Sequence, residues 1–109
     1  AKAMLKASKV KLLPPIPAPG KIICVGLNYK DHAAETGNPL PTYPVIFTRF
    51  TSTLVAHGGK MLAPKASQML DYEAELAVVI GKRGRNIAKD KALSHVGGYS
   101  CFNDGSVRD

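Results

Sequence analysis

The sequence predicts a mainly β (α+β) chain, in which short strands outnumber short helices. Apolar runs of about four to eight residues, rich in Val, Ile, Leu and Tyr, recur along the 109 residues, and Gly, Pro, Asn and Asp separate them. Few segments carry helix signals, which argues against a regular alternation of strands and helices. The length suits one domain with a modest core.

The first 20 residues are predicted to be a lead-in to a domain that occupies residues 21–109. The lead-in has a basic arm, residues 1–9, and a Pro-rich stretch, residues 13–20. Proline fixes its own φ angle and lacks an N–H donor, so the stretch is expected to be extended and not helical.

The first half of the domain is predicted to contain strands and one short helix. Residues 21–25 indicate an apolar strand that ends at Gly26. Asn28 is expected to cap a helix over residues 29–36, with Gly37 as its C-terminal stop. Further strand-like segments follow, separated by loops or turns, at residues 45–50, 51–56 and 60–63.

The most informative segment is a predicted strand over residues 71–80. Alternate side chains of a strand share a face, so Glu73 and Glu75 are expected to point the same way, with Cα atoms about 6.6–7 Å apart. Two carboxylates this close repel each other unless a cation or a shared proton lies between them. The alternative is the exposed polar face of an edge strand.

The last part of the chain is predicted to hold a helix, a strand and a polar turn. Asn86 is expected to cap a helix over residues 87–95 that stops at residues 97–98. A strand then covers residues 99–102, and residues 103–109 are turn-like.

Asp104 adds a third carboxylate just past the end of the last predicted strand. Together with Glu73 and Glu75 it would supply three oxygen ligands, a set that suits Mg²⁺, Mn²⁺ or Ca²⁺ better than Zn²⁺. The alternative is an ordinary turn aspartate before Gly105.

His32 and Glu35 form a candidate pair for activating water. Their i, i+3 spacing places them on one face of the predicted helix, where the carboxylate can orient the imidazole. The alternative is a weak pair on a surface helix. Arg108 could bind an anionic substrate through two parallel hydrogen bonds, or it could be a solvated arginine.

Composition excludes some classes of partner. The net charge is +7, but the basic residues are scattered and only 6% of residues are aromatic, so we expect a solvated surface that attracts anionic substrates and no nucleic-acid partner. No apolar run reaches the roughly 18–20 residues of a membrane span, and no signal core follows the basic arm. A cytoplasmic location is expected. Cys24 and Cys101 are predicted to be buried free thiols.

Four stretches, taken in order, resemble the fumarylacetoacetate hydrolase family. They are residues 21–35, 44–47, 71–82 and 96–109. Each motif alone has little specificity, whereas four motifs in the family's order and spacing are specific. The similarity runs from about residue 12 to the end of the sequence.

The resemblance implies a mixed β-sandwich roll, commonly assembled as a homodimer. It also implies C–C bond hydrolysis, decarboxylation or isomerisation of acylpyruvates and related 2-oxo acids. The family's residues that bind Mg²⁺ or Mn²⁺ match Glu73, Glu75 and Asp104. Such an ion would stabilise the enolate that is left when a 1,3-diketone is cleaved.

The resemblance also assigns roles to the remaining candidates. His32 and Glu35 match the family's water-activating pair on a short helix, and Arg108 matches an arginine near the substrate carboxylate. Family members continue well past the last motif, so the fold is expected to be incomplete here. The alternatives are a hydroxymuconate-type isomerase or decarboxylase of the same family, and a non-catalytic truncated fragment.

Overall fold

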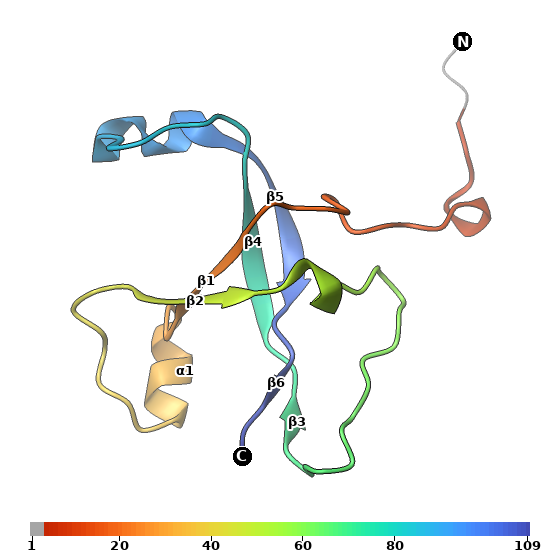
Figure 1. Ribbon diagram of the computed structural model, residues 1–109, viewed down its shortest axis with the longest axis horizontal. Coiled ribbons are helices and arrows are strands. Elements are labelled where there is room, and N and C mark those ends of the chain that lie inside the picture. The colour runs from red at the N-terminus through yellow and green to blue at the C-terminus, as the bar shows by residue number, and fades with distance from the viewer. Residues whose placement is uncertain (1–3) are drawn as a thin grey trace. The chain divides into compact units, whose positions relative to one another are not determined.

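The computed structural model describes residues 4–109, and its elements are mostly strands (Figure 1). The predicted mainly β class is confirmed. The chain forms two compact units, which meet in sequence between Gly59 and Lys60. A 3-10 turn, η1 (Ala7–Lys9), lies in the basic arm, whose residues 1–3 fall outside the described residues. The Pro-rich stretch 13–20 contains no helix or strand, as predicted.

The first unit is built on one antiparallel strand pair. Strands β1 (Ile22–Gly26) and β2 (Val45–Arg49) are paired along their whole length. Both coincide closely with predicted strands. The Arg49 guanidinium lies 5.5 Å from the centre of the Phe47 ring, within the range of a cation–π contact.

A single helical turn and a half, α1 (Lys30–Glu35), follows β1. The predicted cap at Asn28 is wrong. The N-cap is the next residue, Tyr29, and its side chain makes no capping hydrogen bond. Ala33 is the helix residue that is buried, with 1% of its surface exposed.

The predicted stop at Gly37 is confirmed and has a clear backbone cause. Gly37 has a φ of +68°, its N–H donates to the Ala34 carbonyl at 3.1 Å, and the Asn38 N–H donates to the Ala33 carbonyl at 2.9 Å. This is the Schellman arrangement. Because a Cβ disfavours positive φ, we expect Gly37→Ala to lower the free energy of unfolding by about 1 kcal/mol. Urea denaturation would measure this change; an equal loss in Gly20→Ala, which has open space and no positive φ, would contradict it.

The strand predicted over residues 51–56 is wrong. The structure has a 3-10 turn there, η2 (Thr51–Thr53). The Thr53 hydroxyl donates to the Phe50 carbonyl at 2.7 Å, and the Thr51 hydroxyl donates to the Pro19 carbonyl at 3.0 Å. The threonine hydroxyls here donate to backbone carbonyls, which in a strand would instead accept hydrogen bonds from a neighbouring strand. The brief strand predicted over residues 60–63 is also absent.

The second unit is a long two-stranded antiparallel ribbon with a short break. Pairing joins β4 to β5 on one side of the break and β3 to β6 on the other (Figure 1). The strands are β3 (Leu70–Asp71), β4 (Ala74–Ile80), β5 (Val96–Asn103) and β6 (Ser106–Val107). The single strand predicted over residues 71–80 is therefore interrupted, and β6 was not predicted.

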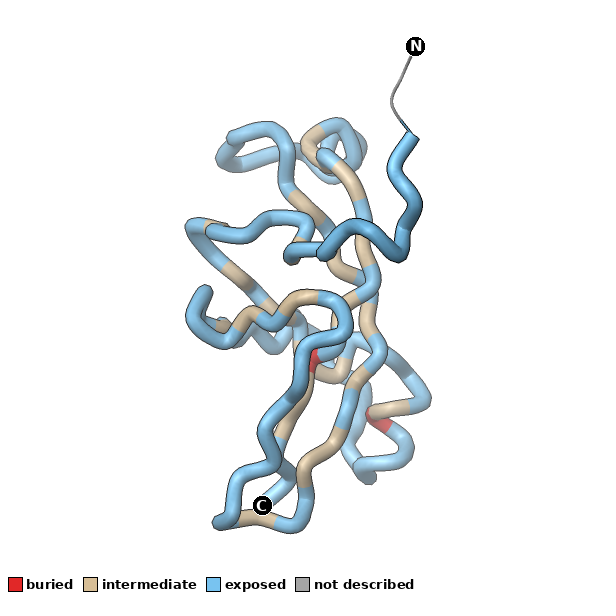
Figure 2. Tube along the Cα trace, turned by 90° about the vertical axis from the view of Figure 1, so that its right-hand side faces the viewer, coloured by how far each residue is buried: buried red, intermediate tan, exposed pale blue. Residues whose placement is uncertain are grey.

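The register is the same on both sides of that break. Asp71 stands opposite Ser106, and Ala74 stands opposite Asn103. Two residues lie between these pairs on each segment, so residue 72 faces residue 105 and residue 73 faces residue 104. On the first segment, burial alternates from Asp71 to Ile80 through the break; on the second it alternates from Val96 to Asp104, after which Gly105 and Ser106 are both half-buried. Figure 2 shows intermediate and exposed residues following one another along the chain. Tyr72 and Ile80 lie on the open face and are 73% and 68% exposed.

The segment before β5 corrects two further predictions. Helix 87–95 is a 3-10 helix, η3 (Lys89–His95), and its N-cap Ala88 makes no side-chain capping bond, so the predicted cap at Asn86 is wrong. Gly97 and Gly98 do not follow the helix as a stop, because β5 begins at Val96 and includes both.

A β-bulge lies near the start of β5. The register of the ribbon shifts between Val79 and Ile80, and Val79 stands opposite Gly98. Gly97 passes so close to Gly81 that a Cβ placed on Gly97 would lie 2.9 Å from the Gly81 Cα. Two glycines are needed where the backbones approach this closely.

Little of the described chain is buried. Ala33 and Asp104 are the buried residues among those described, and no large side chain is fully enclosed. Neither Cys24 nor Cys101 forms a disulfide, as predicted. The predicted burial of both thiols is wrong: Cys24 is only half-buried, and Cys101 is exposed because it lies on the open face of β5. Among residues 4–109, we find no helix with the length and apolar character of a membrane span.

Candidate functional site

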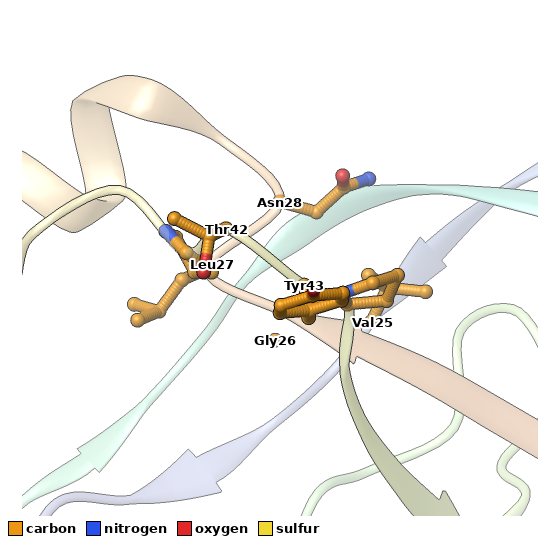
Figure 3. A pocket seen from close by; sticks show the side chains of 8 residues that line it. Val25, Gly26, Leu27, Asn28, Thr42 and Tyr43 are labelled. Carbon is orange, nitrogen blue, oxygen red and sulfur yellow. The ribbon is translucent and has the colours of Figure 1, made fainter.

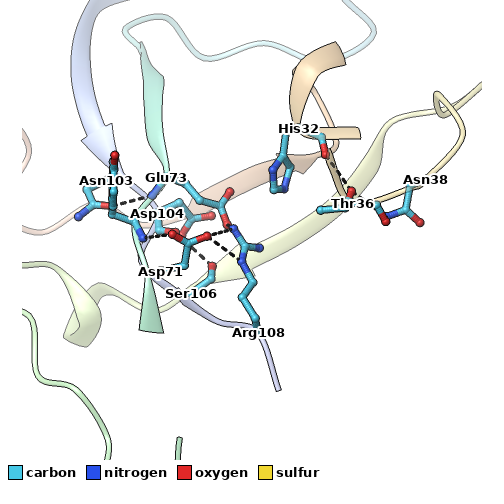
Figure 4. Close-up of polar contacts among 10 residues, drawn as sticks. His32, Thr36, Asn38, Asp71, Glu73, Asn103, Asp104, Ser106 and Arg108 are labelled. Carbon is cyan, nitrogen blue, oxygen red and sulfur yellow. Dashed lines mark hydrogen bonds and ion pairs between the residues drawn. The ribbon is translucent and has the colours of Figure 1, made fainter. Parts of the chain in front are cut away.

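Glu73 and Asp104 face each other across the break in the ribbon (Figure 4). The Asp104 N–H donates to the Glu73 carbonyl at 3.0 Å, and the Glu73 N–H donates to Oδ1 of Asn103 at 3.0 Å. These bonds replace the regular strand ladder at this point. They hold the backbones of two of the predicted metal ligands against each other.

Glu75 lies on the same face of the ribbon as Glu73 and Asp104. It is two residues along from Glu73 and stands opposite Phe102, which makes it the diagonal neighbour of Asp104. Diagonal residues on one face are about 7–8 Å apart. Asp104 is 3% exposed, and both glutamates are partly buried. The ribbon therefore brings the three predicted carboxylates to one sheltered face.

Arg108 is the positive charge on this face. Its Nε donates to Asp71 Oδ2 at 3.1 Å, its Nη2 donates to the same oxygen at 2.9 Å, and Nη2 lies 2.7 Å from Oε1 of Glu73. The hydrogen bond to Asp71 raises the pKa of Arg108, the charges of Glu73 and Asp71 act in the same direction, and desolvation opposes them. The guanidinium is thus held by two carboxylates of the facing segment, one at the end of β3 and one in the break.

The donor chemistry of this face fits a hard divalent ion. Carboxylate oxygens are the ligands that Mg²⁺ and Mn²⁺ prefer, and the register supplies three of them. Within the described residues, however, no group of three or more His, Cys, Asp or Glu side chains is gathered around one point that could hold a metal. In this arrangement the Glu73 carboxylate contacts Arg108 instead.

His32 and Glu35 belong to the first unit, on α1. His32 is partly buried, Glu35 is exposed, and their side chains, both within the described part of the chain, are not joined by a hydrogen bond. The Thr36 hydroxyl donates to the His32 carbonyl at 2.8 Å, which fixes the end of the helix and not the imidazole (Figure 4). The expected His–Glu bond is therefore not formed here.

The first unit also has an open hollow beside the end of β1 (Figure 3). It has a volume of about 250 Å³ and is lined by residues 25–28 and 41–44. Asn28, Thr42 and Tyr43 are its polar side chains, and none of the lining residues carries a charge at neutral pH. The hollow offers packing surface rather than acid–base chemistry.

Asp71 is the residue of this site that the sequence analysis missed. The available signal was that Asp71, Glu73 and Glu75 alternate, which places all three on one strand face. Its partner, Arg108, is 37 positions away in the sequence, so the contact follows from the register of the ribbon and not from a local pattern.

Comparison with known proteins agrees with the motifs and the strand-rich architecture. The family model described as "Fumarylacetoacetate (FAA) hydrolase C-terminal" matches residues 21–109. The chain is 47% identical over 106 residues to the oxaloacetate tautomerase fahd2, mitochondrial, of Xenopus laevis, covering 97% of this chain and 33% of that protein. It is 46% identical over 100 residues to an uncharacterized Archaeoglobus fulgidus protein, covering 92% and 40%.

Solved structures also resemble this chain, and one of them is named as a fumarylacetoacetate hydrolase. A fumarylacetoacetate hydrolase from Exiguobacterium antarcticum superposes with a TM-score of 0.65 at 38% identity, covering 89% of this chain and 35% of that one. A Mycobacterium smegmatis protein gives a TM-score of 0.76 at 44% identity, covering 85% and 33%. The chain spans about a third of the length of the first of these relatives and of both structures. It is a partial fumarylacetoacetate-hydrolase-type fold, and the chain belongs to the fumarylacetoacetate hydrolase family.

Proposed function

We propose that this chain forms part of the active site of a divalent-metal-dependent enzyme that hydrolyses a C–C bond of an acylpyruvate or a related 2-oxo acid. The observation that carries the proposal is the sheltered ribbon face, where Glu73 stands opposite Asp104 and Glu75 is the next residue on that face. Membership of a family that includes a protein named as a hydrolase supports the reaction class.

In this proposal Glu73, Glu75 and Asp104 hold Mg²⁺ or Mn²⁺. When bound, such an ion supplies an electrophile for the oxygens of a 2-oxo acid. The low exposure of Asp104 favours the role, because a sheltered carboxylate gains more from a cation than a solvated one. The ribbon backbone keeps the three residues in register.

The remaining residues act on the proton and the substrate. His32 takes a proton from the attacking water, and Glu35 orients its ring once the two side chains are joined. Arg108 binds the substrate carboxylate through Nη1, since Nε and Nη2 are occupied by Asp71 and Glu73. The proposed assembly is a homodimer in the cytoplasm; the Xenopus laevis relative, by contrast, is named mitochondrial.

A second candidate within the same family is tautomerisation or decarboxylation of a 2-oxo diacid. The identity of 47% to a protein named oxaloacetate tautomerase favours it. It requires proton transfer at the carbon next to the 2-oxo group and no attacking water. A non-catalytic fragment is the alternative from outside the enzyme class.

Absorbance assays separate these possibilities. The purified chain is mixed with acetylpyruvate or oxaloacetate, with Mg²⁺ or with EDTA, and the ultraviolet band of each substrate is followed. Metal-dependent loss of acetylpyruvate absorbance supports hydrolysis, whereas metal-dependent change of oxaloacetate alone supports the tautomerase. Turnover that EDTA does not affect contradicts the metal role, and no turnover with either substrate supports the fragment.

We expect His32→Ala to keep Mn²⁺ binding and to lower acetylpyruvate turnover about 10²–10⁴-fold, the usual contribution of a general base. Isothermal titration with Mn²⁺ and the absorbance assay measure the two effects separately. His57→Ala is the matched control, since His57 lies in a turn and has no proposed role. Unchanged turnover in His32→Ala would place the base elsewhere.

A further inference from the structure

The Arg108 guanidinium touches two carboxylates that differ in how firmly they are held. Asp71 accepts from both Nε and Nη2 on one oxygen, Oδ2, and its other oxygen, Oδ1, accepts the Tyr72 N–H at 2.8 Å. Glu73 meets the guanidinium at Nη2 alone. Asp71 is thus fixed at both oxygens, and it engages the arginine at two nitrogens.

The two carboxylates also differ in position along the ribbon. Glu73 stands opposite Asp104, a proposed metal ligand, whereas Asp71 stands opposite Ser106, two pairs farther toward the end of the ribbon on the same face. Glu73 is the more sheltered side chain, 20% exposed against 47% for Asp71. A glutamate also has one more rotatable bond than an aspartate, so its carboxylate can move farther from a fixed backbone.

We propose that Asp71 is a positioning residue that holds the Arg108 guanidinium, so that the Glu73 carboxylate can exchange from Arg108 to a divalent ion without releasing the arginine. The second half of this proposal rests on the proposed function. With a single partner, Arg108 would compete with the ion for Glu73. With Asp71 present, the guanidinium keeps its hydrogen bonds when Glu73 leaves.

The first test needs no metal. In a ¹⁵N-labelled chain, hydrogen exchange of the Arg108 Nε–H is measured by NMR. We expect Asp71→Asn to speed that exchange about tenfold, as for the loss of one charge-assisted hydrogen bond, and Glu73→Gln to leave it unchanged. Asp71→Glu keeps the negative charge, so its Arg108 Nε–H should exchange about as slowly as in the parent chain. The proposal would be overturned if Glu73→Gln sped the exchange of the Arg108 Nε–H and Asp71→Asn left its rate unchanged.

The second test is a double-mutant cycle read out by Mn²⁺ titration. We expect Asp71→Asn to weaken Mn²⁺ binding by roughly threefold to fivefold, because Arg108 then pairs with Glu73 alone. In an Arg108→Gln background, Asp71→Asn should leave the Mn²⁺ affinity unchanged. In the parent background, Asp71→Glu keeps the negative charge and should bind Mn²⁺ as tightly as the unmodified chain.

Each outcome of the cycle is decisive. An equal loss in both backgrounds would mean that Asp71 acts on the ion by its charge and not through Arg108, which overturns the proposal. If no variant, including the parent chain, binds Mn²⁺, the proposed metal site and the exchange of Glu73 are both wrong, while the NMR result still decides whether Asp71 holds Arg108.

Discussion

Replacing Glu73 with glutamine is expected to weaken Mn²⁺ binding by at least about 100-fold, more than the loss seen when an outer residue of a metal site is removed. The substitution keeps the size of the side chain and removes the charge of one of the three proposed metal ligands. Mn²⁺ binding can be followed by isothermal titration and by the relaxation of water protons.

The matched control for Glu73→Gln is Asp90→Asn. Asp90 is also an acidic residue of the second unit, but its side chain is 69% exposed and pairs with Lys91 at 3.4 Å, so its loss should leave Mn²⁺ affinity unchanged. If Glu73→Gln binds Mn²⁺ as tightly as the parent chain, the assignment of the metal to this face is wrong. Equal losses in both variants would indicate general charge attraction rather than a site.

Gly97→Ala is expected to lower the free energy of unfolding by about 1–3 kcal/mol, the usual cost of overpacking. The new methyl group would lie 2.9 Å from the Gly81 Cα and 3.2 Å from the Gly81 nitrogen, and backbone atoms cannot move aside as a flexible side chain can. Urea denaturation followed by far-ultraviolet circular dichroism measures the change.

The neighbouring glycine provides the control. A methyl group on Gly98 would meet no atom within 4 Å, so Gly98→Ala should leave stability nearly unchanged or raise it slightly. Both glycines lie in β5, and both substitutions alter strand propensity alike. Similar losses in the two variants would mean that propensity, and not the close approach to Gly81, decides the cost.

For the second unit, the sequence predicted which side chains share a strand face better than it predicted where the strands begin and end. Alternation from Asp71 to Ile80 placed Glu73 and Glu75 together, and this holds because the ribbon register does not change at the break. The break itself was not predictable from propensity. It depends on Asn103, whose side-chain oxygen takes the Glu73 N–H, a contact between residues 30 positions apart.

Errors in the first unit and in the connections have local causes. Threonines favour strands on average, yet Thr51 and Thr53 use their hydroxyls to bond backbone carbonyls and a 3-10 turn results. Asn28 and Asn86 were expected to cap helices, but asparagine also tolerates positive φ, and Asn86 adopts a φ of +52° where the chain bends before η3. The same residue type serves either role, and the sequence alone did not decide between them.

The candidate site was predictable as a set of residue types, and less so as a set of contacts. The motifs named Glu73, Glu75, Asp104 and Arg108, and the ribbon places these side chains on one face. The pairing of Arg108 with Asp71 needed the three-dimensional register.

The bulge at Gly97 has a consequence for the chemistry of the ribbon. A slip of one residue between the two strands would turn every side chain of one strand to the other side relative to its partner. Asp104 would then stand opposite Tyr72 or Ala74 instead of Glu73. A bulge cannot slide without moving the close contact of Gly81 and Gly97. This pair of glycines, far along the ribbon from the carboxylates, thereby fixes which residues can serve as ligands.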